Sequence, residues 1–219
     1  MYIAFEGPDG SGKSTQSALI YSYLASQNKE VIYTKEPQDD ELGKIIRTTL
    51  TKSGHNFSDF KDKLKEEQFL HHLFMAARIK YQFSTDGIQD QLNQGKIILQ
   101  DRSFLSNLVY NTPPLNEENF LPELYNAIKD NDIIIKPDII FYFKLDVKKA
   151  LERVKKRDGD DTDKYENEID LKNIINKYNF FIENKEKYLS GIRIIEIEIQ
   201  NYTIEEIHKI VKNNIDLLI

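Results

Sequence analysis

The chain has 219 residues, of which 40% are hydrophobic and 11% aromatic, and this is enough apolar material for one domain over residues 1–219. Its net charge of −6 comes from 36 acidic and 30 basic side chains, and no tail concentrates either sign. We therefore expect no general affinity for nucleic acid or for an anionic membrane. The absence of cysteine excludes disulfides, a thiolate nucleophile and cysteine-based zinc sites.

The first residues, MYIAFEG, lack the basic region and the long apolar run of a secretion signal. The apolar runs elsewhere in the sequence are short and interrupted by charge, whereas a membrane span needs roughly 20 apolar residues. These features predict a cytoplasmic protein.

Short apolar runs alternate with longer stretches of helical periodicity, which is the pattern of a parallel sheet covered by helices on both faces. The helix expected after the first strand has a predicted buried stripe of Ala18, Leu19, Tyr23 and Leu24. Helical spacing also covers residues 171–189, and a final amphipathic helix follows Thr203 as its cap. The predicted strands are Tyr2–Phe5, Val31–Tyr33, Lys96–Leu99, Ile139–Lys144 and Arg193–Glu198.

The first strand leads into a phosphate-binding loop, GPDGSGKS, which satisfies the pattern G-x-x-x-x-G-K-[ST]. Its glycines let the backbone wrap around phosphate with the N–H groups pointing inward, and the following helix adds the positive end of its dipole. Lys13 supplies a point charge to the outer phosphates, and Ser14 is placed to ligate Mg²⁺. The predicted ATP-binding residues of this loop are Gly7, Asp9, Gly10, Ser11, Gly12, Lys13, Ser14 and Thr15.

This loop alone does not distinguish a switch, a motor and a small-molecule kinase. A GTPase would add a DxxG element after one strand and an NKxD element after another. Residues 40–43 follow a polar run instead, and residues 176–179 lack the final Asp and lie in a helical pattern. A motor is compatible with Asp101, which follows an apolar strand and could hold Mg²⁺ through water, but little chain is left for partner modules.

Cationic side chains at the ends of predicted elements favour a kinase with a second phosphate-bearing substrate. Phosphoryl transfer depends mainly on positioning and charge stabilisation, so such a substrate requires its own cations. Arg102 follows Asp101 at the carboxyl edge of the sheet, where the phosphates of donor and acceptor would meet. Any one arginine taken alone is more often a solvated surface charge. The cations of this set are Arg47, Arg78, Arg102, Arg153 and Arg157.

Five motifs in chain order resemble those of the thymidylate kinase family. The phosphate-binding loop with its internal Asp9 is similar to that family's G-x-D-G-x-G-K-[ST], and TKEPQDDELGKIIRTTL resembles the stretch around its T-R-E-P motif. HLFMAARIKY resembles its L-F-x-x-x-R helix, and DRSFLSNLVYN its D-R-x-x-x-S-x-x-A-Y-Q motif. RVKKRDGDDTDKYE is similar to its lid. The chain departs from these motifs at Lys35, Gln38, Asp39, Asn111 and Lys164.

The resemblance implies an α/β fold, a P-loop NTPase-type three-layer sandwich with a five-stranded parallel sheet flanked by helices and a mobile lid at about 153–168. It also implies an ATP- and Mg²⁺-dependent enzyme that converts dTMP to dTDP by direct in-line transfer, and a homodimer. The departures keep a broader-specificity deoxynucleoside monophosphate kinase as an alternative. A non-catalytic P-loop nucleotide-binding protein is the second alternative.

From the loop pattern and from the end of a strand, respectively, Ser14 and Asp101 are the expected metal-binding residues. By the resemblance, Arg153 would join the loop at ATP. The implied catalytic residues are Lys13, Asp9, Arg102, Arg157 and Lys164. The implied acceptor-binding residues are Glu36, Pro37, Arg47, Phe74, Arg78, Arg102, Ser106, Tyr110 and Asn111.

Phe74 and Arg78 are four residues apart, so on a helix they share a face and can address one ligand. A guanidinium only donates hydrogen bonds, so Arg78 favours a base that presents a carbonyl oxygen, such as thymine. The amino group of cytosine would leave both groups unpaired, at a cost of roughly 1–3 kcal/mol. A simpler interpretation is that Phe74 is a core residue, because the apolar Leu73 and Met75 flank it.

Overall fold

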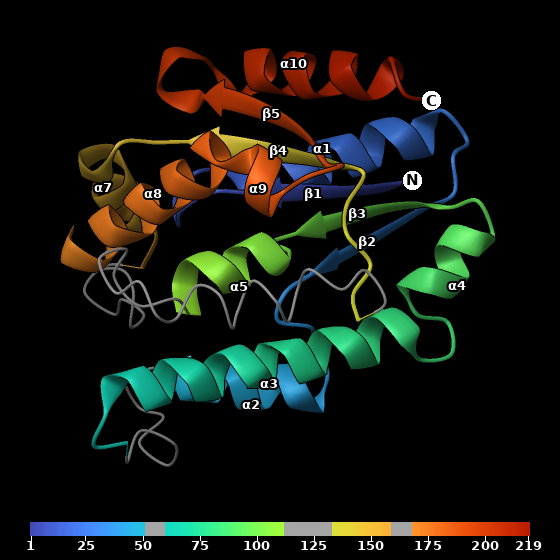
Figure 1. The fold of residues 1–219 in the computed structure, drawn as a ribbon. Coiled ribbons are helices and arrows are strands. Elements are labelled where there is room, and N and C mark those ends of the chain that lie inside the picture. Colours follow the sequence, from blue (N-terminus) through green and yellow to red (C-terminus); the bar gives the residue numbers. More distant parts are fainter. Residues whose placement is uncertain (51–59, 112–132, 159–167) are drawn as a thin grey trace.

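The computed structural model describes residues 1–50, 60–111, 133–158 and 168–219. Its strands are β1 (Tyr2–Glu6), β2 (Val31–Lys35), β3 (Ile97–Asp101), β4 (Ile139–Lys144) and β5 (Arg193–Glu198). They form one parallel five-stranded sheet in the order β2-β3-β1-β4-β5 (Figure 1). The predicted sheet is thereby confirmed.

Three strands run further toward their carboxyl ends than predicted. The residues added there are polar: Glu6 ends β1, Lys35 ends β2 and Asp101 ends β3. Backbone pairing continues through these positions whatever the side chain, because the ladder uses only N–H and C=O groups. As a result, charged side chains stand at the carboxyl edge of a buried sheet.

Helices cover both faces of the sheet, which makes the three-layer arrangement predicted from the sequence. The helices of the described residues are α1 (Lys13–Ser26), α2 (Glu41–Leu50), α3 (Lys63–Phe83), α4 (Ile88–Asn93), α5 (Phe104–Asn111), α7 (Val147–Asp158), α8 (Glu168–Glu183), α9 (Lys185–Tyr188) and α10 (Ile204–Asp216). Figure 1 shows α1 and α10 over one face, and α5 and α8 over the other. None of these helices is long and apolar enough to cross a membrane.

The central strand β1 is buried on both faces. Ile3 and Phe5 belong to the core cluster that includes Ile20 of α1 and Val211 of α10. Ala4 belongs to the cluster on the opposite face, with side chains from α5 and α8. Successive side chains of a strand point to opposite faces, so this alternation anchors β1 between two helical layers. The loop that follows β1 therefore starts from a strand that is buried on both faces.

The predicted buried stripe of α1 is wrong at Ala18 and Leu19, which are exposed. The buried residues of α1 are instead Lys13, Gln16, Ser17, Ile20 and Leu24. These residues follow helical spacing from Lys13, so they lie on the face of the helix toward which Lys13 points. Two of them, Gln16 and Ser17, are polar. The apolar pattern alone pointed to a different face of the helix.

The predicted helix over 171–189 is two helices, because α8 ends at Glu183 and α9 begins at Lys185. Between them, the side-chain amide of Asn184 donates to the carbonyl oxygen of Phe180 at 2.8 Å, a local bond that competes with continued helix. The predicted cap of the last helix is confirmed. Thr203 Oγ1 accepts from the Glu206 N–H at 3.2 Å, and Glu206 Oε2 accepts from the Thr203 N–H at 2.8 Å.

We expect Thr203→Ala to lower the free energy of unfolding by about 1 kcal/mol, because the Glu206 N–H loses its acceptor. Ser22→Ala is the matched control, since the Ser22 hydroxyl, on an exposed helix face, bonds no described residue other than Ala18, whose carbonyl oxygen lies one turn back. That change should stay within about 0.5 kcal/mol. Urea denaturation of the two variants measures both values, and equal losses would contradict a capping contribution from Thr203.

Candidate active site

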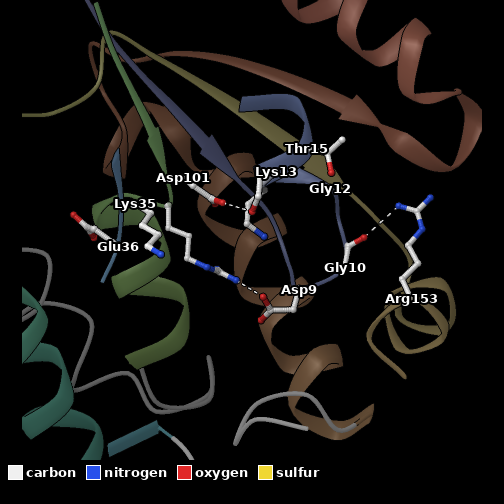
Figure 2. A pocket seen from close by; sticks show the side chains of 11 residues that line it. Asp9, Gly10, Gly12, Lys13, Thr15, Lys35, Glu36, Asp101 and Arg153 are labelled. Atoms are coloured by element: carbon white, nitrogen blue, oxygen red, sulfur yellow. Dashed lines mark hydrogen bonds and ion pairs between the residues drawn. The ribbon is translucent and has the colours of Figure 1, made fainter. Parts of the chain in front are cut away.

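A cleft of about 390 Å³ lies at the carboxyl edge of the sheet. Parallel strands bring their carboxyl ends to one edge, so the chain segments after β1, β2 and β3 meet there. Figure 2 shows Lys35 and Glu36 on one side of the cleft and Arg153 on the other, with Asp9 and Lys13 between them. Its lining in the described part of the chain is Asp9, Gly10, Gly12, Lys13, Ser14, Thr15, Lys35, Glu36, Asp101, Arg102 and Arg153.

The loop after β1 requires glycine at positions where the backbone turns sharply. Gly12, which precedes α1, has a φ of 86°, in the left-handed region. A Cβ at Gly7 would lie 2.6 Å from the carbonyl oxygen of Phe143, so no larger residue fits there without a shift of the backbone. The loop therefore packs closely against β4 and delivers Lys13 to the first turn of α1, as the motif predicted.

Lys13 is a buried ammonium group at the centre of the cleft. Its Nζ donates to the carbonyl oxygen of Pro8 at 2.9 Å and to Ser11 Oγ at 3.5 Å, and both acceptors are uncharged. Burial and the nearby Arg102 guanidinium lower the pKa of Lys13 to about 8. The site thus holds a cation at a cost in free energy, which an incoming phosphate would offset.

Ser14 and Asp101 lie together, as predicted for a metal site. Ser14 Oγ donates to Asp101 Oδ2 at 2.5 Å. Asp101 Oδ1 is buried and has no hydrogen-bond partner among the described residues. An unsatisfied buried carboxylate oxygen is costly, and carboxylate and hydroxyl oxygens are the ligands that Mg²⁺ takes. The two residues therefore fit a magnesium ion.

Arg102 connects the end of β3 to the loop after β1. Its Nη2 donates to Asp9 Oδ1 at 2.5 Å, and its Nη1 donates to Ser106 Oγ at 3.3 Å. Its guanidinium also lies 4.9 Å from the ring centre of Tyr110, whose hydroxyl donates to Asp9 Oδ2 at 3.0 Å. Burial alone would lower the pKa of Arg102, but the Asp9 carboxylate raises it well above its ordinary value. Arg102 thus contacts three other predicted site residues, Asp9, Ser106 and Tyr110.

Arg78 of α3 is buried and paired with Glu36, the residue after β2. Its Nε and Nη2 donate to the two carboxylate oxygens at 2.9 and 2.5 Å, and Gln100 Nε2 adds a bond to Glu36 Oε1 at 2.9 Å. Burial opposes the charge of Arg78, but the Glu36 carboxylate raises the pKa of the guanidinium. Phe74 on the same helix is half-buried, and the core cluster that takes in Met75 does not include it.

The structure places Arg47 against the chain after β2. Its Nη1 donates to the carbonyl oxygen of Pro37 at 2.9 Å, and its Nη2 donates to that of Gln38 at 2.6 Å and to Asp39 Oδ1 at 2.7 Å. Arg47 therefore braces the loop that carries Glu36. It is not among the lining residues of the cleft, so its predicted contact with the acceptor phosphate stays a prediction.

The cations predicted for the lid are only partly described. Arg153 of α7 is exposed, and its Nη1 donates to the carbonyl oxygen of Gly10 at 3.2 Å. Arg157 lies in the last turn of α7. Lys164 and the rest of the predicted lid over residues 159–167 lie outside the described residues. At the end of α5, Asn111 is buried, and its Nδ2 donates to Asn107 Oδ1 at 2.7 Å.

Three residues of the site region were not predicted as site residues from the sequence, although Lys35 was noted as a departure from a family motif. Lys35 lines the cleft, Gln100 bonds Glu36, and the buried Glu6 accepts hydrogen bonds from α5 and α8. Each is a polar residue at or near the carboxyl end of an apolar strand, and this position could have predicted a site role for all three. In the sequence, only Asp101 was assigned a role on that ground.

The chain is similar to known proteins in both sequence and structure. A family model described as thymidylate kinase matches residues 5–209. The thymidylate kinase of Thermosipho africanus is 35% identical over 88% of this chain and 93% of its own length. That of Thermosipho melanesiensis is 31% identical over 99% of this chain and all of its own. The solved structure of thymidylate kinase from Candida albicans superposes with a TM-score of 0.72 at 25% identity, over 99% of this chain and 91% of that chain.

We expect Lys13→Met to stabilise the ligand-free protein at pH 7, because it removes a buried ammonium group. The pKa of Lys13 is about 8 in the folded protein and 10.5 ordinarily. The buried charge therefore destabilises the folded wild type fully below pH 8, and this destabilisation disappears as the pH rises from 8 to 10.5. Over that range, the stability of the variant relative to the wild type should fall by on the order of 3 kcal/mol. Urea unfolding at pH 7, 9 and 10.5 measures it, and an advantage that does not depend on pH would be the contrary result.

Proposed function

This chain belongs to the thymidylate kinase family, and on that premise we propose how its cleft transfers the γ-phosphoryl group of ATP to dTMP. The family makes it a nucleoside monophosphate kinase that forms dTDP, which is the function predicted from the sequence. The observation that carries the proposal is the convergence of Lys13 and Arg102 on one cleft. Lys13 belongs to the donor loop, and Arg102 stands at the end of the neighbouring strand.

The donor phosphates would occupy the loop after β1. Its N–H groups and the start of α1 attract the anion, and Lys13 would exchange the Pro8 carbonyl oxygen for phosphate oxygens. Ser14 and Asp101 would hold Mg²⁺, directly or through water, and the ion would neutralise charge on the phosphates. Placing Lys13 in advance lowers the cost of reorganisation when ATP binds.

The acceptor phosphate would bind beside Arg102. An oxygen of that phosphate forms a bond to the γ-phosphorus of ATP as the bond to the bridging oxygen of ADP breaks, so no protein nucleophile is needed. Arg102 would stabilise the negative charge that spreads over the transferred group, and Asp9 holds the guanidinium for this task. Arg153, Arg157 and Lys164 would add charge from the donor side and exclude water.

The base of the acceptor would lie near α3. Glu36 fixes the guanidinium of Arg78 with two hydrogen bonds, so the group cannot turn away from its site. Its Nη1, which donates to Met75 Sδ at 3.2 Å, would donate instead to a carbonyl oxygen of thymine. The half-buried ring of Phe74 is not part of the core cluster that takes in Met75 and can stack on the base. Ser106, Tyr110, Asn111 and Pro37 complete the proposed acceptor site.

The oligomeric state, the domain organisation and the location of the protein are three further proposals. A homodimer is supported by apolar side chains exposed on neighbouring helices, such as Ile45 of α2 and Ile79 of α3. One domain over residues 1–219 is supported by the single sheet of the described residues. A cytoplasmic location stays a prediction from the sequence. Asn111 has a shorter reach than the family's glutamine, and this supports broader specificity for deoxynucleoside monophosphates as a second proposal. Membership of a kinase family argues against a purely non-catalytic role.

Acceptor choice tests the function. A coupled assay of ADP release with dTMP, dUMP, dCMP and dGMP should give the highest kcat/KM with dTMP, and absence of turnover with every acceptor would refute the kinase. Arg78→Ala should reduce the preference for dTMP over dCMP by roughly 10-fold, because thymine loses its donor. The matched control is Lys80→Ala, which removes an exposed cation of the same helix and should keep the preference. Unaltered discrimination in the Arg78 variant would refute its assigned role.

The metal site can be tested separately. Asp101→Asn should raise the Mg²⁺ concentration needed for half-maximal activity by about 10-fold, because an amide is a weaker ligand than a carboxylate. Asp86→Asn is the control, since Asp86 lies in a turn before α4 with a φ of 60°, a conformation that Asn also adopts readily. An unchanged Mg²⁺ requirement in the Asp101 variant would count against this carboxylate as a ligand.

A further inference from the structure

The last residue of β1, Glu6, is a fully buried carboxylate that does not line the cleft. Oε1 accepts from the N–H and the hydroxyl of Ser103, at 2.6 and 2.7 Å, and from the Ser106 N–H at 3.3 Å. Oε2 accepts from the Ser106 hydroxyl at 2.6 Å and from the Tyr178 hydroxyl at 2.8 Å. Burying a carboxylate costs free energy unless donors surround it, and these donors come from the start of α5 and from α8.

The backbone of Arg102, between β3 and α5, is in the left-handed region with a φ of 68°. Residues other than glycine rarely adopt this conformation, because it brings Cβ too close to the following carbonyl oxygen. The peptide groups on both sides of Arg102 are tied to β1. The Arg102 N–H donates to the carbonyl oxygen of Phe5 at 3.0 Å, and the Ser103 N–H donates to Glu6 Oε1. The carboxylate thus opposes relaxation of the strained residue.

The same carboxylate also acts on the tip of the Arg102 side chain. Glu6 Oε2 accepts the proton of the Ser106 hydroxyl, which turns the oxygen lone pairs of Ser106 toward other donors. Arg102 Nη1 donates to that oxygen at 3.3 Å. Glu6 is therefore linked to Arg102 twice, through the backbone at one end and through Ser106 at the other.

We propose that Glu6 is a positioning residue for phosphoryl transfer, which holds Arg102 in the left-handed conformation that presents its guanidinium to the acceptor phosphate. The inference rests on the role given to Arg102 in the proposed function. Glu6 touches neither substrate. Its loss should release the backbone at Arg102 and displace the guanidinium, while the bonds of Lys13 within the phosphate-binding loop remain.

The test is a double-mutant cycle with Glu6→Gln, which keeps the shape of the side chain but places an amide donor among five donors. Arg102→Ala should lower kcat/KM for dTMP by about 100-fold. Glu6→Gln should lower kcat/KM for dTMP by about 10-fold, because the Arg102 guanidinium is displaced from the acceptor phosphate. The KM for ATP should stay within about 3-fold of the wild type, because the phosphate-binding loop is unchanged. In the Arg102→Ala background, Glu6→Gln should cost less than about 2-fold.

Two outcomes overturn the inference, and they are distinguishable. An equal loss from Glu6→Gln with and without Arg102 would show that Glu6 supports the fold in general. A wild-type kcat/KM for Arg102→Ala would remove the proposed role of Arg102 itself and the inference with it. If Glu6→Gln does not fold, Ser103→Ala replaces it, since it removes one donor and keeps the peptide N–H. Its loss should be about 3-fold and should also vanish in the Arg102→Ala background.

Tyr142→Phe is the matched control for a lost buried hydrogen bond in the same layer. The Tyr142 hydroxyl donates to Asn179 Oδ1 at 3.3 Å, and its ring stacks on Tyr178, one of the donors to Glu6. This change should leave kcat/KM within about 2-fold in both backgrounds. A loss equal to that of Glu6→Gln would mean that any weakening of this layer slows the reaction, and the specific role of Glu6 would fall.

Discussion

Arg102 reaches from the end of β3 to Asp9 in the loop after β1, and this ion pair joins the two strand ends between which phosphate would move. A cleft built for two phosphate-bearing substrates must hold several cations close together, and burying them costs free energy unless each has a partner. The protein meets this constraint for its two guanidinium groups, because Arg102 is paired with Asp9 and Arg78 with Glu36. Lys13 donates to the uncharged carbonyl oxygen of Pro8, so its burial keeps a cost that phosphate would offset.

Acidic residues at the strand ends therefore do more than supply a metal ligand. Asp9 and Glu36 fix the directions of two guanidinium groups, and Glu6 fixes the backbone that carries one of them. Substrate phosphates can enter this network as additional or replacement acceptors without a large rearrangement of the cations. This explains how a protein with a net charge of −6 forms a phosphate site, because its local cations are held by local carboxylates.

Much of this could be predicted from the sequence because it is encoded locally. The glycine spacing before Lys13 and the apolar strand runs gave the loop and the parallel sheet. Features that depend on contacts between distant segments could not be predicted: the Glu36–Arg78 pair joins β2 to α3, and Arg47 braces the loop after β2. The left-handed backbone of Arg102 is likewise set by β1 and not by its own neighbours in the chain. The prediction of the buried face of α1 was wrong because polar residues, Lys13, Gln16 and Ser17, share that face with Ile20 and Leu24.

The most direct test is a crystal structure with a bisubstrate analogue, adenosine and thymidine joined by five phosphates. The account predicts Lys13 on the phosphates nearer adenosine and the Arg102 guanidinium within about 3 Å of an oxygen of the phosphate nearest thymidine. A complex in which that phosphate lies away from Arg102, with another cation beside it, would contradict the account.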